Sequence, residues 1–591
     1  MSMSRLIEAL LPAPRRGVCL SLGLGVLGAW MITSPAAAQT LTGTATVEVT
    51  VDADDLHDQL ERLHDRLDAA EADREALRRA LDRLGQPPDA SGVSGEPEQP
   101  GAPLPGPPLA SVAGFSMLTP SADSRVVYVS ARGNDNNHGL SPDAPLRTPR
   151  AGYARLRDGF PDHLLFFAGD VFTGNLGAIT KSGRSAQEPM VIGAYVPPGF
   201  PDAPRPILMS PGSAWARKEF NARGSHLVFR GLHILPVYRD PARPDFNPDR
   251  LGRDQWNQAG LQFFGDARNI TVEDCKLERF KFALVFQSDE RSGPLQNVRV
   301  HRTVVADSFG HWNRDIAGHS SGLFARWVDG LTITDSVFDH NGWHPDVSGA
   351  GKTKFNHNVY VQRDCRNVSV RNTVFARASS HGMQLRSGGN VEDSLFVDNA
   401  LAFYVARHES LVRDNVVLHS TDLGDGPDDR RGQGIETLPC VHARLVGNIV
   451  SQKRGTARHA PAIGITWAKE ASSWLDGRDY RVTLDNNRVY DWPRNEGRDP
   501  SVHVGTPSAD VVGLDTNQLD PASGGRFDPA RWLDPERDVE TYAASLGLEP
   551  TLDAFLQRAR NRPLGTWDPR FTAAGVNAHV REGFTEKPSN P

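Results

Sequence analysis

Between residues 357 and 408, the chain is rich in side chains that can transfer protons or bind carboxylates. His and Tyr are suited to general acid–base catalysis. Arg pairs with a carboxylate through two parallel hydrogen bonds. A cation at a sugar carboxylate makes the neighbouring C5 proton more acidic, so these residue types indicate proton transfer at an acidic sugar.

Four residues carry the predicted chemistry. We assign His381 as the base at C5, Tyr360 as the acid at the leaving oxygen, and Arg386 with Arg326 as the pair that binds the carboxylate. A second set is predicted to bind substrate: His357, Asn358, Gln362, Gln384, Tyr404, Arg407 and Glu436.

Simpler interpretations stay open for single members of this set. Tyr360 and Tyr404 could be exposed strand aromatics, and the histidines could cap turns. Glu436 is the one acid among the outward strand positions. Three acids in nearby loops could join it in hydrolysis by two carboxylates, namely Asp315, Asp339 and Asp346.

These residues fall on short segments that align as strands. The aligned segments are 260–264, 283–287, 322–326, 358–362, 382–386, 402–406 and 434–438. Because side chains alternate across a strand, Val359 and Val361 are expected inward and Tyr360 outward. Neighbouring strands lie about 4.8 Å apart, so Arg326 and Arg386 are expected about 10 Å apart with Gln362 between them.

A repeat organises the whole region from about residue 268 to 506. Eight segments alternate apolar residues, reach a polar pair and continue with a second apolar pair. The polar pairs are Asp274-Cys275, Arg302-Thr303, Asp335-Ser336, Asn372-Thr373, Asp393-Ser394, Asp414-Asn415, Gly447-Asn448 and Asn486-Asn487. Their minimum spacing is 21 residues, which predicts one coil of a parallel β-helix with a tight bend at each pair.

Three insertions lengthen this repeat at the same point, between the bend and the strand that follows it. They span residues 311–321, 340–357 and 421–433. Loops on one edge of a solenoid form the walls of its binding face. The insertions therefore point to the face that carries His381 and Arg386.

The entry to the repeat contains a strand, Val126–Ser130, and a long turn, Gly133–Thr148. This stretch resembles the start of pectate-lyase-like right-handed parallel β-helix proteins, and the resemblance extends over roughly residues 125–506. It implies an all-β, single-stranded right-handed parallel β-helix, here predicted over 125–524. The superfamily includes polysaccharide lyases, uronate epimerases, hydrolases, esterases and adhesins, so fold does not fix activity.

The groove residues resemble, in type, those of the alginate-lyase and mannuronan-epimerase branches. We therefore predict an exported enzyme acting on an acidic polysaccharide, with β-elimination as the leading reaction. Hydrolysis and epimerisation on the same fold are alternatives. A third alternative is a non-catalytic glycan-binding or matrix protein displayed on a coiled-coil stalk.

Composition and the N-terminus support export. The 591-residue chain is 39% apolar with a net charge of −7, which gives no basic excess for nucleic acid. Residues 1–38 have the pattern of a signal peptide, although an uncleaved anchor is the alternative. No stable membrane span is expected after cleavage, which would leave the protein in the periplasm or outside the cell.

The remaining segments predict a stalk and a cap. Residues 39–85 contain a heptad seam from Leu56 to Leu84, which predicts a coiled coil and a homo-oligomer, either a dimer or a trimer. Residues 86–124 are a linker rich in Pro and Gly. Residues 525–591 are predicted to be helical and to cover the last coil.

No cofactor is required by the sequence, but one loop has oxygen ligands suitable for Ca²⁺. The candidate ligands are Asp135, Asn136, Asn137 and Asp143. A turn in the first coil is the alternative interpretation.

Overall fold

A computed structural model describes residues 111–588, apart from short gaps. The gaps are residues 113–114, 117, 197–202, 211–220, 223, 249–250, 252–258, 311–318, 425–430, 453–459, 467–473, 476, 493–500, 507–508 and 520–527. All described residues belong to one compact unit, residues 102–591. The predicted signal peptide and coiled coil lie outside the described residues.

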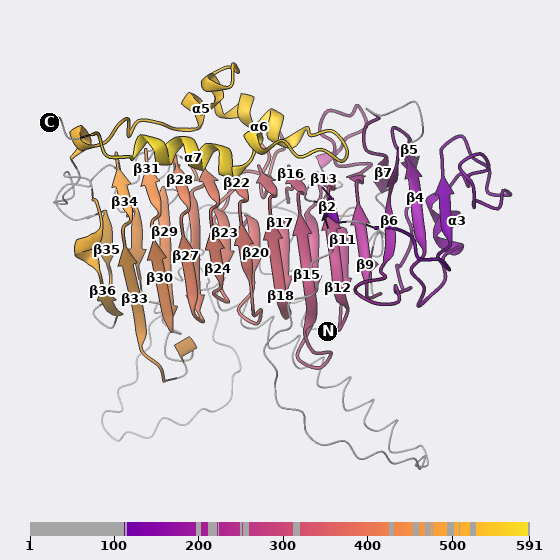
Figure 1. Cartoon of the computed structure of the whole chain (residues 1–591), viewed down its shortest axis with the longest axis horizontal. Coiled ribbons are helices and arrows are strands. Elements are labelled where there is room, and N and C mark those ends of the chain that lie inside the picture. The colour runs from indigo at the N-terminus through magenta and orange to yellow at the C-terminus, as the bar shows by residue number, and fades with distance from the viewer. Residues whose placement is uncertain are drawn as a thin grey trace, which may run out of the picture. The chain divides into compact units, whose positions relative to one another are not determined.

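Three parallel sheets form this unit (Figure 1). Sheet 1 contains β8 (Asn221–Ala222), β11 (Ala259–Phe264), β14 (Phe282–Gln287), β17 (Ser321–Arg326), β20 (His357–Val361), β23 (His381–Leu385), β26 (Leu401–Arg407), β29 (Gln433–Cys440), β32 (Ile463–Ile465) and β35 (Val502–Val504). Sheet 2 contains β3 (Val126–Val129), β4 (His163–Phe167), β6 (Met190–Tyr195), β9 (Leu227–Arg230), β12 (Arg268–Glu273), β15 (Leu295–His301), β18 (Val328–Thr334), β21 (Ser369–Arg371), β24 (Asn390–Glu392), β27 (Ser410–Arg413), β30 (His442–Val446), β33 (Tyr480–Asp485) and β36 (Ala509–Val512). Sheet 3 contains β5 (Val171–Thr173), β7 (Ile207–Ser210), β10 (His233–Pro236), β13 (Lys276–Glu278), β16 (Val304–Ala306), β19 (Val337–Asp339), β22 (Val374–Ala376), β25 (Leu395–Val397), β28 (Val416–Leu418), β31 (Ile449–Ser451) and β34 (Arg488–Tyr490).

The chain visits the three sheets in a fixed order, which is the signature of a parallel β-helix. After β20 in sheet 1 it passes through β21 in sheet 2 and β22 in sheet 3, and then returns to sheet 1 as β23. Each strand pairs in parallel with its counterpart one coil later, as β20 does with β23. The parallel β-helix predicted from the repeat is confirmed.

The predicted bends between sheets 2 and 3 have a common backbone conformation. The first member of all eight polar pairs has a positive φ, between 49° and 65°. The second member is buried and links one coil to the next. Along the later coils the Nδ2 of Asn415 donates to Asn448 (3.0 Å), and the Nδ2 of Asn448 donates to Asn487 (2.8 Å). A short polar side chain that bonds the local backbone tolerates this conformation, which explains the recurrence of Asp and Asn.

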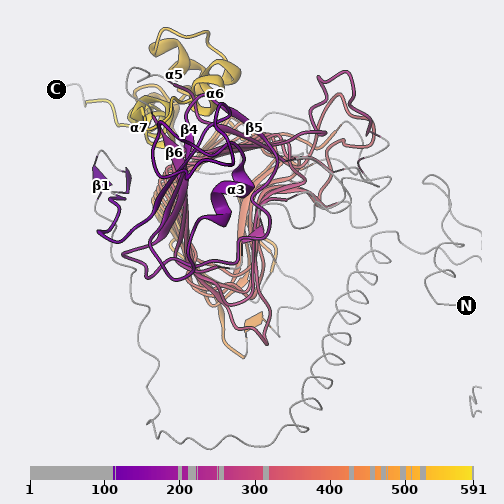
Figure 2. The same ribbon diagram turned by 90° about the vertical axis from the view of Figure 1, so that its right-hand side faces the viewer.

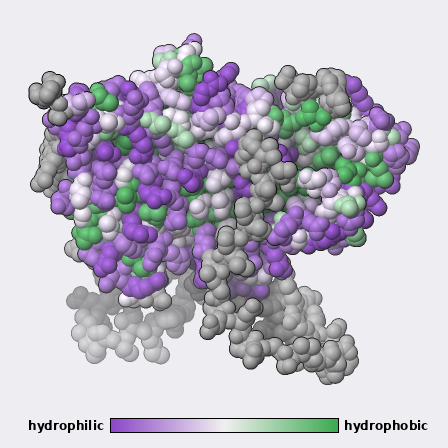
Figure 3. All heavy atoms as spheres, in the orientation of Figure 1, coloured by the Kyte–Doolittle hydropathy of each residue, from purple (hydrophilic) through white to green (hydrophobic). Residues whose placement is uncertain are grey.

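The core lies inside the coils, as strand alternation predicts. Val359, Val361 and Leu385 are fully buried. Phe375 stacks on Phe396 with ring centroids 4.7 Å apart. The face seen in Figure 3 is mainly hydrophilic with scattered hydrophobic residues, which agrees with an inward apolar core.

The C-terminal helices lie along the side of the β-helix, on sheet 3 (Figures 1 and 2). The helical elements of the described chain are α3 (Pro149–Ala154), η4 (Leu514–Thr516), η6 (Pro529–Arg531), α5 (Val539–Ser545), α6 (Leu552–Arg560), η7 (Pro569–Phe571) and α7 (Ala573–Gly583). The expectation that this tail covers the last coil is wrong. The outward residues of sheet 3, such as Val374 and Leu395, are apolar and form one cluster with tail residues such as Phe555 and Val576. The tail buries them along the flank.

The end of the predicted linker is also packed against the β-helix. β1 (Ser111–Val112) and β2 (Phe115–Ser116) form an antiparallel pair. The backbone N–H of Ser116 donates to the buried carboxylate of Glu273 at 3.1 Å, and the Arg302 guanidinium lies 4.4 Å from the Phe115 ring centroid. Among the described residues, no helix has the length and apolar character needed to cross a membrane.

Candidate active site

The predicted site residues form a ladder on the outer face of sheet 1. Strand register places Phe324 beside Tyr360, Tyr360 beside Gln384, Gln384 beside Tyr404, and Tyr404 beside Glu436. Each step is one coil, so an extended ligand along the face would meet these side chains in turn. The long insertions lie between β16 and β17, β19 and β20, and β28 and β29, which puts all three on the edge between sheets 3 and 1.

Two histidines lie together at that edge. The Nδ1 atoms of His381 and His357 are 3.1 Å apart, and the Oγ of Ser380 is 3.0 Å from the Nδ1 of His381. The His381 ring also contacts Tyr404, with centroids 5.4 Å apart. A hydrogen bond between two Nδ1 atoms requires that one ring donates and the other accepts, so the pair fixes complementary tautomers.

The environment keeps both imidazoles neutral. Burial, reinforced by Arg386 and Arg431, lowers the pKa of His381 to about 3. Burial, with His381, His319 and Arg386 nearby, holds the pKa of His357 well below its ordinary range. A neutral imidazole keeps a lone pair that can accept a proton.

Arg386 lies between the two tyrosines. Its Nε donates to the Tyr404 hydroxyl at 3.0 Å, and its guanidinium carbon lies 5.3 Å from the Tyr360 ring centroid. The Nε2 of Gln362 donates to the Tyr360 hydroxyl at 2.9 Å. Burial raises the pKa of Tyr404, and the nearby Arg386 opposes that shift. Because the Tyr360 oxygen accepts the bond from Gln362, the hydroxyl can act as a donor with its own proton.

The ladder also presents two side chains suited to binding sugar hydroxyls. The Oε1 of Gln384 is buried without a hydrogen-bond partner among the described residues. An unsatisfied buried acceptor costs about 1–3 kcal/mol, which a ligand hydroxyl would recover. Burial raises the pKa of Glu436, although the Thr466 hydroxyl, which donates to it at 2.8 Å, opposes the rise.

Asn358 is a correction to the predicted binding set. It is fully buried, and its Nδ2 donates to the Ala376 carbonyl at 2.9 Å. Its Oδ1 accepts from the Nδ2 of Asn341 at 2.9 Å. At this corner the chain turns inward, so Asn358 belongs to a second ladder of buried amides and does not reach the outer face. His357 is 2% exposed, and its ring contacts those of Tyr360 and His381, with centroids 5.2 and 4.7 Å away.

Two predicted arginines lie at the opposite edge, where sheet 1 turns toward sheet 2. Arg326 ends β17. The backbone N–H of Gln362 donates to the Ala325 carbonyl at 2.8 Å, so Arg326 lies one coil before Gln362. The backbone N–H of Arg386 donates in turn to a carbonyl of that next coil, which places Arg326 two coils before Arg386. Arg407 ends β26, and burial lowers its pKa, with Arg386 among the neighbouring cations that add to the effect. Positive charge therefore recurs along this edge.

Sequence reasoning missed two residues whose charges act on the histidine pair. His319 contributes to the lowered pKa of His357, and Arg431 to that of His381. Both belong to the long insertions. Their place at the ends of the insertions, directly before β17 and β29, is the sequence signal that could have identified them.

None of the three acids considered as partners of Glu436 is placed beside it among the described residues. Asp339 is buried on sheet 3, where Arg377 and Arg560 bond to it. Asp346 is exposed in the loop after β19. Asp315 lies outside the described residues.

The loop proposed for Ca²⁺ uses its carboxylate internally. The Oδ1 of Asp135 accepts the backbone N–H groups of Arg147 (2.8 Å) and Thr148 (2.9 Å), and its Oδ2 accepts the Thr148 hydroxyl (2.9 Å). The Nδ2 of Asn137 donates to the Pro145 carbonyl at 2.8 Å. These bonds favour the interpretation of the loop as a structural turn.

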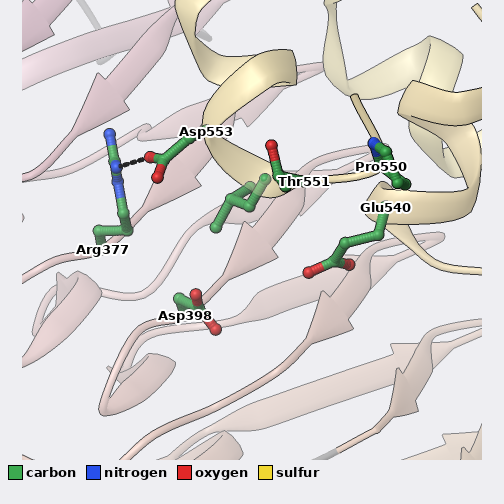
Figure 4. Close-up of a pocket in the computed structure, with 7 residues that line it drawn as sticks. Arg377, Asp398, Glu540, Pro550, Thr551 and Asp553 are labelled. Carbon is green, nitrogen blue, oxygen red and sulfur yellow. Dashed lines mark hydrogen bonds and ion pairs between the residues drawn. The ribbon is translucent and has the colours of Figure 1, made fainter. Parts of the chain in front are cut away.

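Two cavities of the described chain have no ladder residue in their lining. One of about 470 Å³ is formed by the loop after β19, with Trp343, His344 and Lys352 in its lining. The other, of about 290 Å³, lies between the C-terminal helices and sheet 3 and is lined by Arg377, Asp398, Glu540 and neighbouring residues (Figure 4).

Comparisons with known proteins give structural similarities only. No protein-family model matches the chain, and no curated protein matches it. A pectate lyase is 12% identical over 71% of this chain and 85% of that chain, with a TM-score of 0.36. An alginate lyase from Paenibacillus sp. is 11% identical over 61% and 97%, with a TM-score of 0.34. The A-module of a mannuronan C-5 epimerase from Azotobacter vinelandii is 13% identical over 62% and 94%, with a TM-score of 0.32. The strand order and registers given above, not these low similarities, establish the parallel β-helix.

Proposed function

We propose that the outer face of sheet 1 binds an acidic polysaccharide and cleaves it by β-elimination. The observation that carries this proposal is the position of Arg386, which bonds to Tyr404 at 3.0 Å and lies against the Tyr360 ring. A uronate carboxylate bound by Arg386 would lie next to a phenol that can donate a proton. The neutral histidine pair belongs to the coils of Tyr360 and Arg386.

In this reaction His381 removes the C5 proton. The electron pair of the C5–H bond forms the C4–C5 double bond, the C4–O bond breaks, and the leaving oxygen takes a proton from Tyr360. Arg386 and Arg326 bind the carboxylate and stabilise the negative charge that develops on it.

The histidine pair supports the assignment of the base. If the Nδ1–H of His381 donates to His357, the Nε2 of His381 carries the lone pair that accepts the C5 proton. His357 is then a positioning residue that selects this tautomer. A bound carboxylate also offsets the charge of Arg386, which raises the pKa of His381 and makes it a stronger base.

Product analysis with a panel of polysaccharides tests the proposal. The full chain is incubated with uronate polymers and neutral glycans, and ultraviolet absorbance of the new double bond is followed together with reducing ends. Elimination gives both signals on uronate polymers. Epimerisation changes C5 configuration with neither signal, and a binding protein leaves the polymer unchanged; either of these results would contradict the proposal.

Hydrolysis is a second candidate because Glu436 is a carboxyl group with a raised pKa beside Tyr404. A raised pKa favours the protonated carboxyl group, which is the form that acts as the general acid of a glycosidase. Reducing ends without a double bond, lost in Glu436→Gln and kept in His381→Ala, would establish this alternative.

A further inference from the structure

A second cluster of ionisable side chains lies outside the ladder, where the C-terminal tail meets sheet 3. His419 directly follows β28, has a φ of 56° and is 2% exposed. Asp538 is the N-cap residue of α5 and Glu540 lies in its first turn, more than a hundred residues later. One potential ligand atom from each of the three residues lies within 4.8 Å of the other two.

The hydrogen bonds of His419 fix which nitrogen faces the carboxylates. Its Nδ1 lies 3.1 Å from the Gln452 carbonyl oxygen. A carbonyl oxygen only accepts, so Nδ1 carries a hydrogen and donates. In the neutral ring, Nε2 then carries a lone pair, yet it lies 3.0 Å from the Oε2 of Glu540 and 3.6 Å from the Oδ2 of Asp538. Three acceptor atoms therefore converge, and a proton or a metal ion must lie among them.

The spacing of the acceptors is close to that of ligands around a tetrahedral metal ion. Bonds of about 2.0–2.2 Å at tetrahedral angles place ligand atoms roughly 3.3–3.6 Å apart. The 3.6 Å separation between Nε2 and the Oδ2 of Asp538 falls in this range, and the 3.0 Å separation between Nε2 and the Oε2 of Glu540 is slightly shorter. A histidine that donates its other nitrogen to a backbone carbonyl is also the usual arrangement of a metal ligand. We propose that His419, Asp538 and Glu540 bind a divalent transition-metal ion such as Zn²⁺, which accepts both imidazole and carboxylate ligands.

The surroundings hold the ligands in place and leave room for a fourth. The Oδ1 of Asp538 accepts the backbone N–H of Thr541 at 2.7 Å as part of a helix capping box, so its Oδ2 is oriented toward His419. Glu540 also lines the cavity of about 290 Å³ (Figure 4). A water molecule from this cavity can complete the coordination.

Such an ion would join the tail to the β-helix. Two ligands belong to α5 and its N-cap, and one directly follows β28. Because the three residues come together only in the folded chain, metal binding would stabilise it, and the gain would grow with the logarithm of the metal concentration above Kd. The site is independent of the chemistry proposed for sheet 1.

Metal titration tests this site. Full-length protein without an affinity tag is stripped with a chelator and titrated with Zn²⁺, Mn²⁺, Ca²⁺ and Mg²⁺ by calorimetry and thermal unfolding. We expect one Zn²⁺ per chain and a rise in Tm of several degrees. His419→Gln and Glu540→Gln should weaken Zn²⁺ binding by about 100-fold or more, whereas His138→Gln, in an exposed loop of the first coil, should bind as the wild type does.

Two results would overturn the proposal. Stoichiometric Zn²⁺ binding retained in both variants would place the ion elsewhere. An absence of Zn²⁺ binding by the wild type at millimolar concentration would mean that a proton occupies the cluster. Asp538→Asn serves as a further variant if either substitution prevents folding, which circular dichroism detects.

Discussion

At the scale of single residues, the proposed site contains a histidine that stays neutral because it is packed among other groups. Burial, Arg386 and Arg431 all disfavour the charged form of His381 and lower its pKa to about 3. The same packing holds its ring 4.7 Å from that of His357. Position and protonation state are therefore set by the same contacts.

This pKa predicts a specific loss of stability in acid. Between pH 6.5 and about 3 the unfolded chain binds a proton on His381 that the folded chain does not bind, so the free energy of unfolding falls as pH falls. At 1.36 kcal/mol per pH unit, the loss from His381 between pH 6.5 and 4.5 is about 2–3 kcal/mol. Denaturation at several pH values should show that the free energy of unfolding falls less in acid for His381→Asn than for the wild type or His138→Asn. Equal losses in all three proteins would contradict the assignment.

The buried amides give a second residue-scale prediction. Asn415 accepts the Ser394 N–H at 3.0 Å and donates to the Val391 carbonyl at 2.8 Å. Asn415→Ala leaves these buried groups without those bonds, at about 1–3 kcal/mol for each. Thermal unfolding should show a clear loss for Asn415→Ala and almost none for Asn390→Ala, an exposed position on sheet 2. If Asn415→Ala leaves the stability unchanged, the ladder of buried amides contributes little to the folding free energy.

At the scale of elements, the bends and the alternation of the strands could be predicted from the sequence. A polar residue that tolerates positive φ recurs at one point of each coil, and Tyr360 and Gln384 face outward by simple alternation. Asn358 could not be placed in this way because it lies at a corner, where alternation stops. The tail on sheet 3 was missed although a signal was present: the outward residues Val374 and Leu395 are apolar, which indicates a covered sheet.

One arginine of α6 joins the tail to three carboxylates of the β-helix. Arg560 bonds to Asp307 and Asp339 and pairs with Glu278 at 3.3 Å, all on sheet 3 or directly after it. Burial raises the pKa of Glu278, but His233, Lys276 and Arg560 reverse this and hold it well below the ordinary range.

Arg560→Met would leave these carboxylates without their shared cation. Removal of one partner from a buried ionic cluster typically costs about 3–5 kcal/mol. Chemical denaturation should show that loss, whereas Arg558→Met on the same helix should change stability by less than about 1 kcal/mol. Equal stability of the two variants would show that the apolar contacts alone hold the tail.

At the scale of the whole molecule, the heptad seam from Leu56 to Leu84 predicts an oligomer, although it lies outside the described residues. The pairing of β1 and β2 begins at Ser111, so removal of residues 39–110 spares every described contact. Light scattering should find an oligomer before this deletion and a folded monomer after it. A monomeric starting protein, or an oligomer that survives the deletion, would refute the assignment of the seam.

The central claim is that the outer face of sheet 1 carries out β-elimination on an acidic polysaccharide. The most direct measurement is the rate of double-bond formation from a uronate polymer by the wild type, His381→Ala, Arg386→Lys and the surface control Arg371→Lys. A general base contributes roughly 10²–10⁴-fold, so His381→Ala should lose about that much activity with little change in Tm. Arg386→Lys should also lose activity, because a point charge does not reproduce two parallel hydrogen bonds, while Arg371→Lys keeps it. Full activity in both site variants would place the reaction elsewhere on the molecule.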